Sequence, residues 1–236
     1  MTTMTIFPLL ALDTATEGCS AALLIGDTLL ERFEIAPRRH AELILPMIEA
    51  LLAEAGVSRR QLGGIAVGRG PGAFTGVRLA ISVAQGIALG LDLPVVAVSS
   101  LAALAQDAPD VTGASILATI DARMGEIYAG AFQRTAGGLV EAIDAECVGH
   151  ADRLALPAHD RWVVVGSGWD AYREALSQRL PHAPISADGA RYPRASAVAR
   201  LAAVQFTNGL AVAPELALPV YLRDKVALTL DEQHAR

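Results

Sequence analysis

The sequence is poor in residues that carry metal, redox and covalent chemistry. Its 236 residues include two cysteines, Cys19 and Cys147, which lie far apart and fit no CxxC pattern, so we expect reduced thiols rather than a disulfide framework. The five histidines form no HxxxH or HxH pair, which argues against a zinc or iron site. Lys225 is the only lysine, which excludes a P-loop lysine or a Schiff base in the body of the fold. The sequence predicts neither a resident metal nor a cofactor.

The sequence also lacks an excess of positive charge and a long apolar run. The formal net charge is −6, and this sign does not attract nucleic acid, so a role on RNA would need a more basic partner. We find no run of about 18 apolar residues without a polar interruption. The N-terminus shows no basic region followed by an apolar stretch and a cleavage site. We therefore expect a cytoplasmic protein without a membrane segment.

Apolar residues are plentiful. They make up 53% of the chain, and the mean hydropathy is positive at +0.39, which excludes wholesale disorder. A chain of this length buries a proper core, either as one large domain or as two small ones.

The first part of the chain is typical of a three-stranded unit followed by a helix. We predict strands at Leu9–Ala15, Cys19–Ile25 and Leu29–Ile35, with a hairpin turn at Gly26 between the second and the third. The spacing of apolar residues then changes to a helical period over Arg39–Ala55. One face of this helix is suited to cover the sheet.

The stretch from Gly64 to Leu91 is the part around which the rest is organised. It predicts a buried strand at Ile65–Val67, a glycine-rich loop, and a helix that begins at an N-cap on Thr75 and runs to Leu91. The loop is either a tight turn that needs unusual backbone angles or an anion cradle at a helix N-terminus. Both readings stay open, and the tight turn is favoured.

Both predicted helices are too apolar to face water on their outer sides. Leu45, Pro46 and Leu52 interrupt the polar face of the first helix, and the second has only a narrow polar strip. The second helix also carries an i, i+4 row of small residues, which lets another backbone approach closely. This row is Gly76, Ala80, Ala84 and Ala88. We predict that these faces meet another subunit, and that the chain self-associates when that subunit is missing.

The second half of the sequence repeats the first. Strands are predicted at Ile116–Arg123, Glu126–Gln133 and Leu139–Glu146, and the first of them ends near an acid, Asp121, as the first strand of the chain ends at Asp13. We predict an internal duplication and an α/β fold of two actin-like (ribonuclease H-like, ASKHA) lobes, with mixed sheets and flanking helices. The lobes would span residues 1–108 and 109–213, and a tail, residues 214–236, would pack back on the N-terminal lobe.

In actin-like proteins and sugar kinases, the acids on the first strands face a cleft that holds nucleotide phosphates. The positions that correspond here are Asp13, Thr14, Asp121 and Gly166. The alternative is that each acid only accepts hydrogen bonds from the turn that follows it, as Asp often does. This alternative is at least as strong, because bulky residues replace the glycine-rich hairpin expected after the first acid.

Five segments together resemble one family. They are Leu10-Ala-Leu-Asp-Thr-Ala-Thr-Glu-Gly-Cys-Ser, His40-Ala-Glu-Leu-Ile-Leu-Pro-Met, Gly68-Arg-Gly-Pro-Gly-Ala-Phe-Thr-Gly-Val-Arg, Ile120-Asp-Ala-Arg-Met-Gly-Glu-Ile-Tyr and Pro219-Val-Tyr-Leu-Arg. On these motifs, which span the chain nearly end to end, the sequence is identified as a member of the TsaB (YeaZ) family.

The resemblance implies a non-catalytic subunit of the bacterial machinery that places threonylcarbamoyl on the adenosine next to the anticodon of tRNAs reading codons that begin with A. In that family TsaB pairs with the catalytic subunit TsaD through its first two helices, the ATPase TsaE joins the pair, and tRNA is reached only through the complex. A homodimer is expected when TsaD is absent. Combined with the apolar faces above, this gives a predicted partner surface of Glu42, Leu45, Pro46, Glu49, Leu52, Arg78, Ile81, Ser82, Ala84 and Gln85.

Two enzyme functions are the alternatives. The chain could be an independent nucleotide-dependent phosphotransferase, against which stands the bulky first turn. It could also be a glycopeptidase, a label that related sequences have carried. The absence of HxxxH, HExxH and GxSxG motifs argues against peptidase chemistry.

Overall fold

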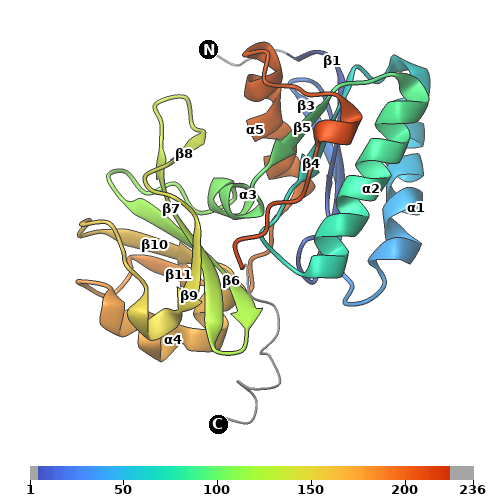
Figure 1. Cartoon of the computed structure of the whole chain (residues 1–236). Coiled ribbons are helices and arrows are strands. Elements are labelled where there is room, and N and C mark those ends of the chain that lie inside the picture. The colour runs from blue at the N-terminus through green and yellow to red at the C-terminus, as the bar shows by residue number, and fades with distance from the viewer. Residues whose placement is uncertain (1–4, 224–236) are drawn as a thin grey trace, which may run out of the picture.

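Two mixed β-sheets form the frame of the molecule (Figure 1). The computed structural model describes residues 5–223. In the first sheet the strand order is β3-β2-β1-β4-β5. Its strands are β1 (Thr5–Asp13), β2 (Gly18–Gly26), β3 (Thr28–Ile35), β4 (Gly64–Gly68) and β5 (Val95–Val98).

The second sheet repeats the order of the first, because read from its other edge it runs β8-β7-β6-β10-β11. In both sheets three antiparallel strands are followed by two parallel ones. The strands are β6 (Ser115–Arg123), β7 (Glu126–Arg134), β8 (Val140–Ala142), β10 (Trp162–Val165) and β11 (Ser186–Asp188), and β9 (Cys147–His150) also pairs with β7. The predicted two-lobed, actin-like α/β fold is confirmed.

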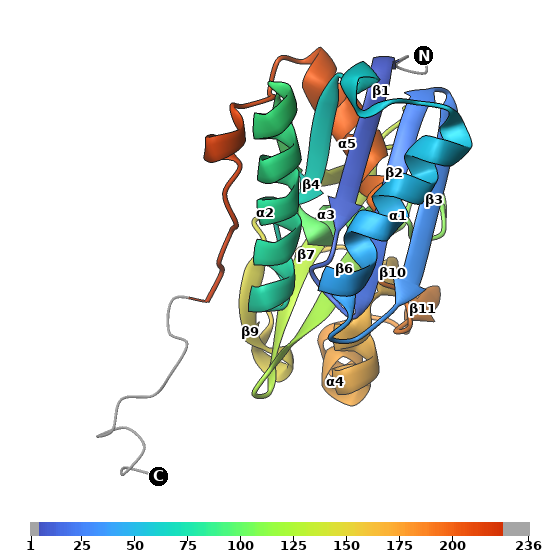
Figure 2. The same ribbon diagram turned by 90° about the vertical axis from the view of Figure 1, so that its right-hand side faces the viewer.

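Helices cover the outer faces of the two sheets. On the first sheet, α1 (His40–Ala55) and α2 (Phe74–Leu91) lie side by side (Figure 2). On the second, α4 (Ser167–Arg179) packs on β6 and on a 3₁₀ turn at Ala151–Arg153, which stands where the first lobe has α1. The duplication is therefore complete in the strands and incomplete in the helices.

The two remaining helices lie between the sheets and are exchanged between the lobes. The helix α3 (Ser100–Gln106) follows the first sheet but packs on β6 and β7, and α5 (Ala195–Thr207) follows the second sheet but packs on β1 and β2. Together with facing strand residues of both sheets they form one continuous apolar core. Each lobe thus completes its core with a helix from the other half of the sequence.

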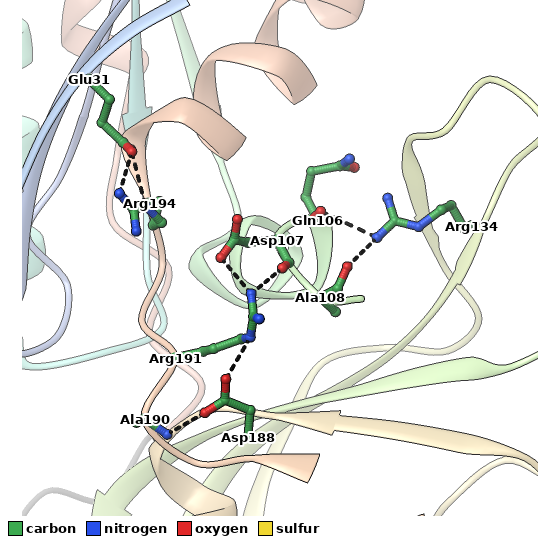
Figure 3. Close-up of polar contacts among 9 residues, drawn as sticks. All are labelled: Glu31, Gln106, Asp107, Ala108, Arg134, Asp188, Ala190, Arg191 and Arg194. Carbon is green, nitrogen blue, oxygen red and sulfur yellow. Dashed lines mark hydrogen bonds and ion pairs between the residues drawn. The ribbon is translucent and has the colours of Figure 1, made fainter. Parts of the chain in front are cut away.

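Arginine side chains fasten this exchange (Figure 3). The guanidinium of Arg191 donates to the Asp107 carbonyl at the end of α3 (2.6 Å) and pairs with the carboxylates of Asp107 (3.0 Å) and Asp188 (2.9 Å). At the start of α5, Arg194 donates to the Glu31 carboxylate of β3 at 2.7 Å. The Asp107 carbonyl at the end of α3 and the Ser196 amide at the start of α5, which donates to the Glu31 carboxylate at 2.9 Å, are thus satisfied by the other half of the sequence. Because the halves interpenetrate in this way, the lobe boundaries at 108 and 213 stay predictions.

Two predicted element boundaries are wrong. The helix α2 begins at Phe74, with Ala73 as its N-cap, rather than after an N-cap at Thr75. The Ala73 amide donates to the Ala15 carbonyl (2.7 Å), which fixes the start of the helix against the turn that follows β1. The predicted strand Leu139–Glu146 stops at Ala142, and the chain turns before it pairs again with the other end of β7 as β9.

Among residues 5–223, α2 alone is long and apolar enough to cross a membrane by length and composition, with a mean hydropathy of 1.5. The sequence analysis found no such stretch. One side of α2 packs on the first sheet, against which small and β-branched residues are buried. This packing accounts for the apolar composition of the helix.

Candidate functional site

An apolar groove runs between α1 and α2 on the outer surface of the first lobe. It has a volume of about 680 Å³. Leu45, Ile48 and Leu52 of α1 and Ile87 and Leu91 of α2 line it. Glu49 and Arg59, which form an ion pair at 2.5 Å, lie at its edge. The sides of the two helices that were predicted to be too apolar for water therefore bound one open groove.

The predicted row of small residues does not face this groove. Gly76, Ala80, Ala84 and Ala88 are buried against the chain's own sheet and hairpin. A Cβ atom on Gly76 would overlap the carbonyl oxygen of Thr14. The prediction that Ala84 lies at the partner surface is therefore wrong, because the close approach that this row permits is used inside the chain.

A second row of small residues on α2, Ser82, Gly86 and Gly90, is exposed. A Cβ atom on Gly86 or Gly90 would meet no heavy atom within 4 Å, and both glycines line the groove. The sequence analysis missed them, although their i, i+4 spacing from Ser82 was a usable signal. This row lets the backbone of another helix approach α2 from outside.

Substitution of Ala84 by leucine is expected to destabilise the fold by about 1–3 kcal/mol, because Ala84 has no exposed surface and a larger side chain overpacks the interface with the sheet. Denaturant unfolding of the purified variant measures this loss. An unchanged free energy of unfolding would show that the contact between α2 and the sheet is looser than the structure has it.

The other predicted partner residues divide into three groups. Exposed ones that flank the groove or lie on the outer turns of α1 and α2 are Glu42, Leu45, Pro46, Glu49 and Ser82. Leu52 and Ile81 are buried within the chain, with 5% and 4% of their surface exposed. Leu52 still lines the groove, whereas the prediction for Ile81 is wrong because its side chain packs into the core.

Arg78 and Gln85 form the third group, because they bind a segment of the same chain. We call residues 214–223 the strap. The Gln85 amide nitrogen donates to the carbonyls of Pro214 (3.1 Å) and Ala217 (3.2 Å), and Nε of Arg78 donates to the Tyr221 hydroxyl (2.7 Å). Figures 1 and 2 show the strap running along α2 on the side away from α1. These two residues of the predicted partner surface therefore hold the strap.

The lower part of the strap also reaches the second lobe. Val220 donates its amide to the Arg69 carbonyl of the first lobe at 3.0 Å. Arg223 donates to the Ala122 carbonyl at 3.0 Å and pairs with Glu126. The rest of the predicted tail, residues 224–236, lies outside the described residues.

The first acid, Asp13, is buried without access to a cleft. Its carboxylate accepts hydrogen bonds from the Ala15 amide (2.9 Å) and the Ser100 hydroxyl (3.0 Å), and burial raises the pKa of Asp13 to about 6. Thr14 donates its hydroxyl to the Gly76 carbonyl at 2.6 Å. The turn that would hold phosphate in an actin-like protein is thus filled by the start of α2.

The second acid, Asp121, pairs with Arg123 at 2.9 Å and accepts a hydrogen bond from the Tyr172 hydroxyl at 3.4 Å. A Cβ atom at Gly166 would overlap the Thr119 carbonyl oxygen, so this glycine is needed for close packing at a φ of 101°. Of the four predicted nucleotide residues, Asp121 lines a cavity, whereas Asp13 and Thr14 have no exposed surface. The predicted grouping around one nucleotide is wrong for Asp13, Thr14 and Gly166, because their own chain occupies the space.

The cavity beside Asp121 lies between the lobes and has a volume of about 270 Å³. Its walls come from the turn after β1, the loop before α2 and the first turn of that helix, the end of β6 with Tyr128 of β7, and the strap. Within residues 5–223, no group of three or more His, Cys, Asp or Glu side chains is placed to hold a metal ion. Burial raises the pKa of the Cys19 thiol to about 11, so this thiol is not an activated nucleophile.

The fold and these sites define a two-lobed actin-like protein. Its own chain fills the turns after β1 and β10, where other proteins of this fold bind phosphate, and an apolar groove lies open between α1 and α2. A family model described as TsaD, tRNA N6-adenosine threonylcarbamoyltransferase, matches residues 33–229. The tRNA threonylcarbamoyladenosine biosynthesis protein TsaB of Escherichia coli is 41% identical over 228 residues, which is 93% of this chain and 96% of the relative. The protein of the same name from Haemophilus influenzae is 37% identical, over 92% and 94%.

Among solved structures, YeaZ from Pseudomonas aeruginosa has a TM-score of 0.84 and is 45% identical, covering 92% of this chain and 100% of that one. The chain belongs to the TsaB family. The resemblance drawn from the five sequence segments is confirmed.

Proposed function

We propose that this chain is a non-catalytic subunit of the bacterial complex that forms N6-threonylcarbamoyladenosine in tRNA, and that it acts by pairing with TsaD. The relatives of this chain are named as biosynthesis proteins of that modification. The observation that carries the proposal is the open apolar groove between α1 and α2, with the exposed row of Ser82, Gly86 and Gly90 beside it. A groove of this kind fits the packing of a partner's helices against both α1 and α2.

The filled phosphate turns support a non-catalytic role. A nucleotide-dependent phosphotransferase of this fold would need space beside Asp13, where the Thr14 hydroxyl and the Ala15 carbonyl are bonded to the start of α2. The turn after β10 is closed in the same way by the contact of Gly166 with Thr119. These contacts favour the scaffold over the phosphotransferase.

The charge of the chain bears on its partners. With a net charge of −6, the chain reaches tRNA only through a more basic subunit. TsaE is the third member of the proposed complex. In the absence of TsaD, the groove is expected to be covered by a second copy of the chain, because large apolar surfaces rarely stay exposed.

Reconstitution tests the proposal. Threonylcarbamoylation of tRNA is measured with TsaD, TsaE and preformed threonylcarbamoyl adenylate, with and without this chain. We expect activity only when the chain is added, and no ATP hydrolysis by the chain alone. Activity that is independent of the chain would contradict the proposal, and ATP turnover by the chain alone would return the phosphotransferase to consideration.

A further inference from the structure

A second apolar surface lies on the side of α2 along which the strap runs, away from the groove (Figure 2). Leu89 lies one helical turn beyond Gln85, which holds the strap, and 63% of its surface is exposed. On the strap itself, Leu216 and Leu218 are 62% and 60% exposed, and they flank Ala217, which is fully buried against the first lobe. The strap thus buries its small residue and leaves its two large apolar residues exposed.

An arginine lies over two aromatic rings on the same side of α2. The guanidinium of Arg78 is 3.7 Å from the ring centroid of Phe74 and 5.6 Å from that of Tyr221, and its Nε donates to the Tyr221 hydroxyl. All three side chains are exposed. These contacts are with neutral groups, so within residues 5–223 the guanidinium is held in position without an ion pair.

This chemistry indicates the kind of molecule that covers the surface. Arginine and aromatic side chains are enriched at protein–protein interfaces. A guanidinium that is already fixed on aromatic rings loses little conformational freedom when it pairs with a carboxylate, which it can bind through two parallel hydrogen bonds. The surface therefore fits a protein partner that brings a carboxylate to Arg78 and apolar side chains to the leucines beside it.

Helix α2 joins this surface to the groove. By the rotation of about 100° per residue, the exposed Ser82 and Gly86 lie between Leu89, on the strap side, and Ile87, which lines the groove. A helix with its side chains is about 10 Å wide. A partner helix that packs on Ser82 and Gly86 therefore reaches both sides of α2.

We propose that TsaD covers this surface together with the groove, and that it brings a carboxylate to Arg78 and apolar side chains to Leu216 and Leu218. The inference rests on the proposed function, because it adds the strap to the surface through which the chain pairs with TsaD. The strap then belongs to the interface as well as to the chain's own fold.

Titration calorimetry of the full chain with purified TsaD tests the apolar part of the surface. Leu218→Asp is expected to weaken pairing by about tenfold or more, because it places a charge in an apolar contact. Ile185→Asp places the same charge on an exposed apolar residue of the second lobe, so we expect it to pair as the parent chain does.

The same measurement at several salt concentrations tests the charged part. Arg78→Gln is expected to weaken pairing and to make it less dependent on salt, because the ion pair with TsaD is lost. Tyr221→Phe removes the hydrogen bond from Arg78 to the strap but keeps the ring and the charge, so we expect it to keep the salt dependence of the parent. A salt dependence that is the same in Arg78→Gln and in the parent would contradict the carboxylate.

The outcomes separate this inference from the proposed function. A parent chain that does not bind TsaD would contradict both. A parent chain that binds TsaD, together with a Leu218→Asp variant that binds it equally well, would overturn the inference alone. Weaker self-association of Leu218→Asp with unchanged binding of TsaD would also overturn it, and would give the surface to a second copy of the chain. A lower melting temperature of Leu218→Asp by itself would mean that Leu218 packs within the chain, which overturns the inference as well.

Discussion

Replacement of Gly86 by leucine is expected to weaken pairing with TsaD by roughly 10- to 100-fold, since overpacking of a close helix contact costs about 1–3 kcal/mol. Gly86 is exposed, lines the groove, and has open space where a side chain would project. A leucine side chain there would occupy the path of an approaching helix. Titration calorimetry with purified TsaD measures the effect.

The same substitution is expected to stabilise the chain by itself, because glycine in a helix interior is less favourable than other residues by up to about 1 kcal/mol. Loss of pairing with unchanged or higher stability would separate an interface effect from misfolding. Ala84→Leu, on the buried side of the same helix, is the matched control. It should have a lower free energy of unfolding than the parent chain, whereas Gly86→Leu should not. If Gly86→Leu pairs with TsaD as the parent does, the groove is not the interface.

The contrast between Gly86 and Ala84 shows what the sequence of α2 does not predict, namely which of its two rows of small residues faces the sheet. Both lie in an i, i+4 row of small residues, and both rows satisfy the same spacing. Only the position of the sheet distinguishes them, because Val77 and Ile81 are buried together with the first row. A helix with apolar residues nearly all round gives no periodic signal that selects its inner face.

The strands were easier to predict. A short apolar run that ends at a turn residue such as Gly26 is a local pattern, and the repeat of this pattern around Asp121 was enough to predict the two-lobed fold. The sequence analysis predicted that the tail packs on the N-terminal lobe, but it could not predict which side chains hold it, because Gln85 and Pro214 meet across 129 residues of sequence. No local property of Gln85 distinguishes a side chain that holds a strap from one at a subunit interface.

Asp13 shows a similar ambiguity at a candidate active site. An acid at the end of a first strand serves either phosphate chemistry or the turn that follows, and both are consistent with the sequence. The structure decides for the turn, since the carboxylate bonds to Ala15 and Ser100 and packs against Gly68. The bulky residues after Asp13 were the signal for this outcome.

Replacement of Asp13 by asparagine is expected to stabilise the chain at pH 7 by up to about 3 kcal/mol, which corresponds to a pKa of about 6 in the folded state against 3.8. Because burial raises the folded pKa, the folded state keeps its proton at pH values where the unfolded state has lost it. In the parent chain, protonated Asp13 therefore makes its full contribution to the free energy of unfolding below about pH 4. This contribution is lost as the pH rises through about 6.

An asparagine at position 13 keeps an oxygen that accepts from the Ala15 amide and a group that donates to the Ser100 hydroxyl, and it carries no charge to bury. Urea unfolding at several pH values between 3.5 and 8 measures the difference between the two proteins. We expect the gap to open between pH 4 and pH 6. Asp27→Asn, at an exposed hairpin turn, removes the same charge and should produce no such gap. A parent chain that gains stability relative to Asp13→Asn as the pH rises would mean that the ionised carboxylate is favoured in the fold, as expected if Asp13 bound a cation or faced an open cleft.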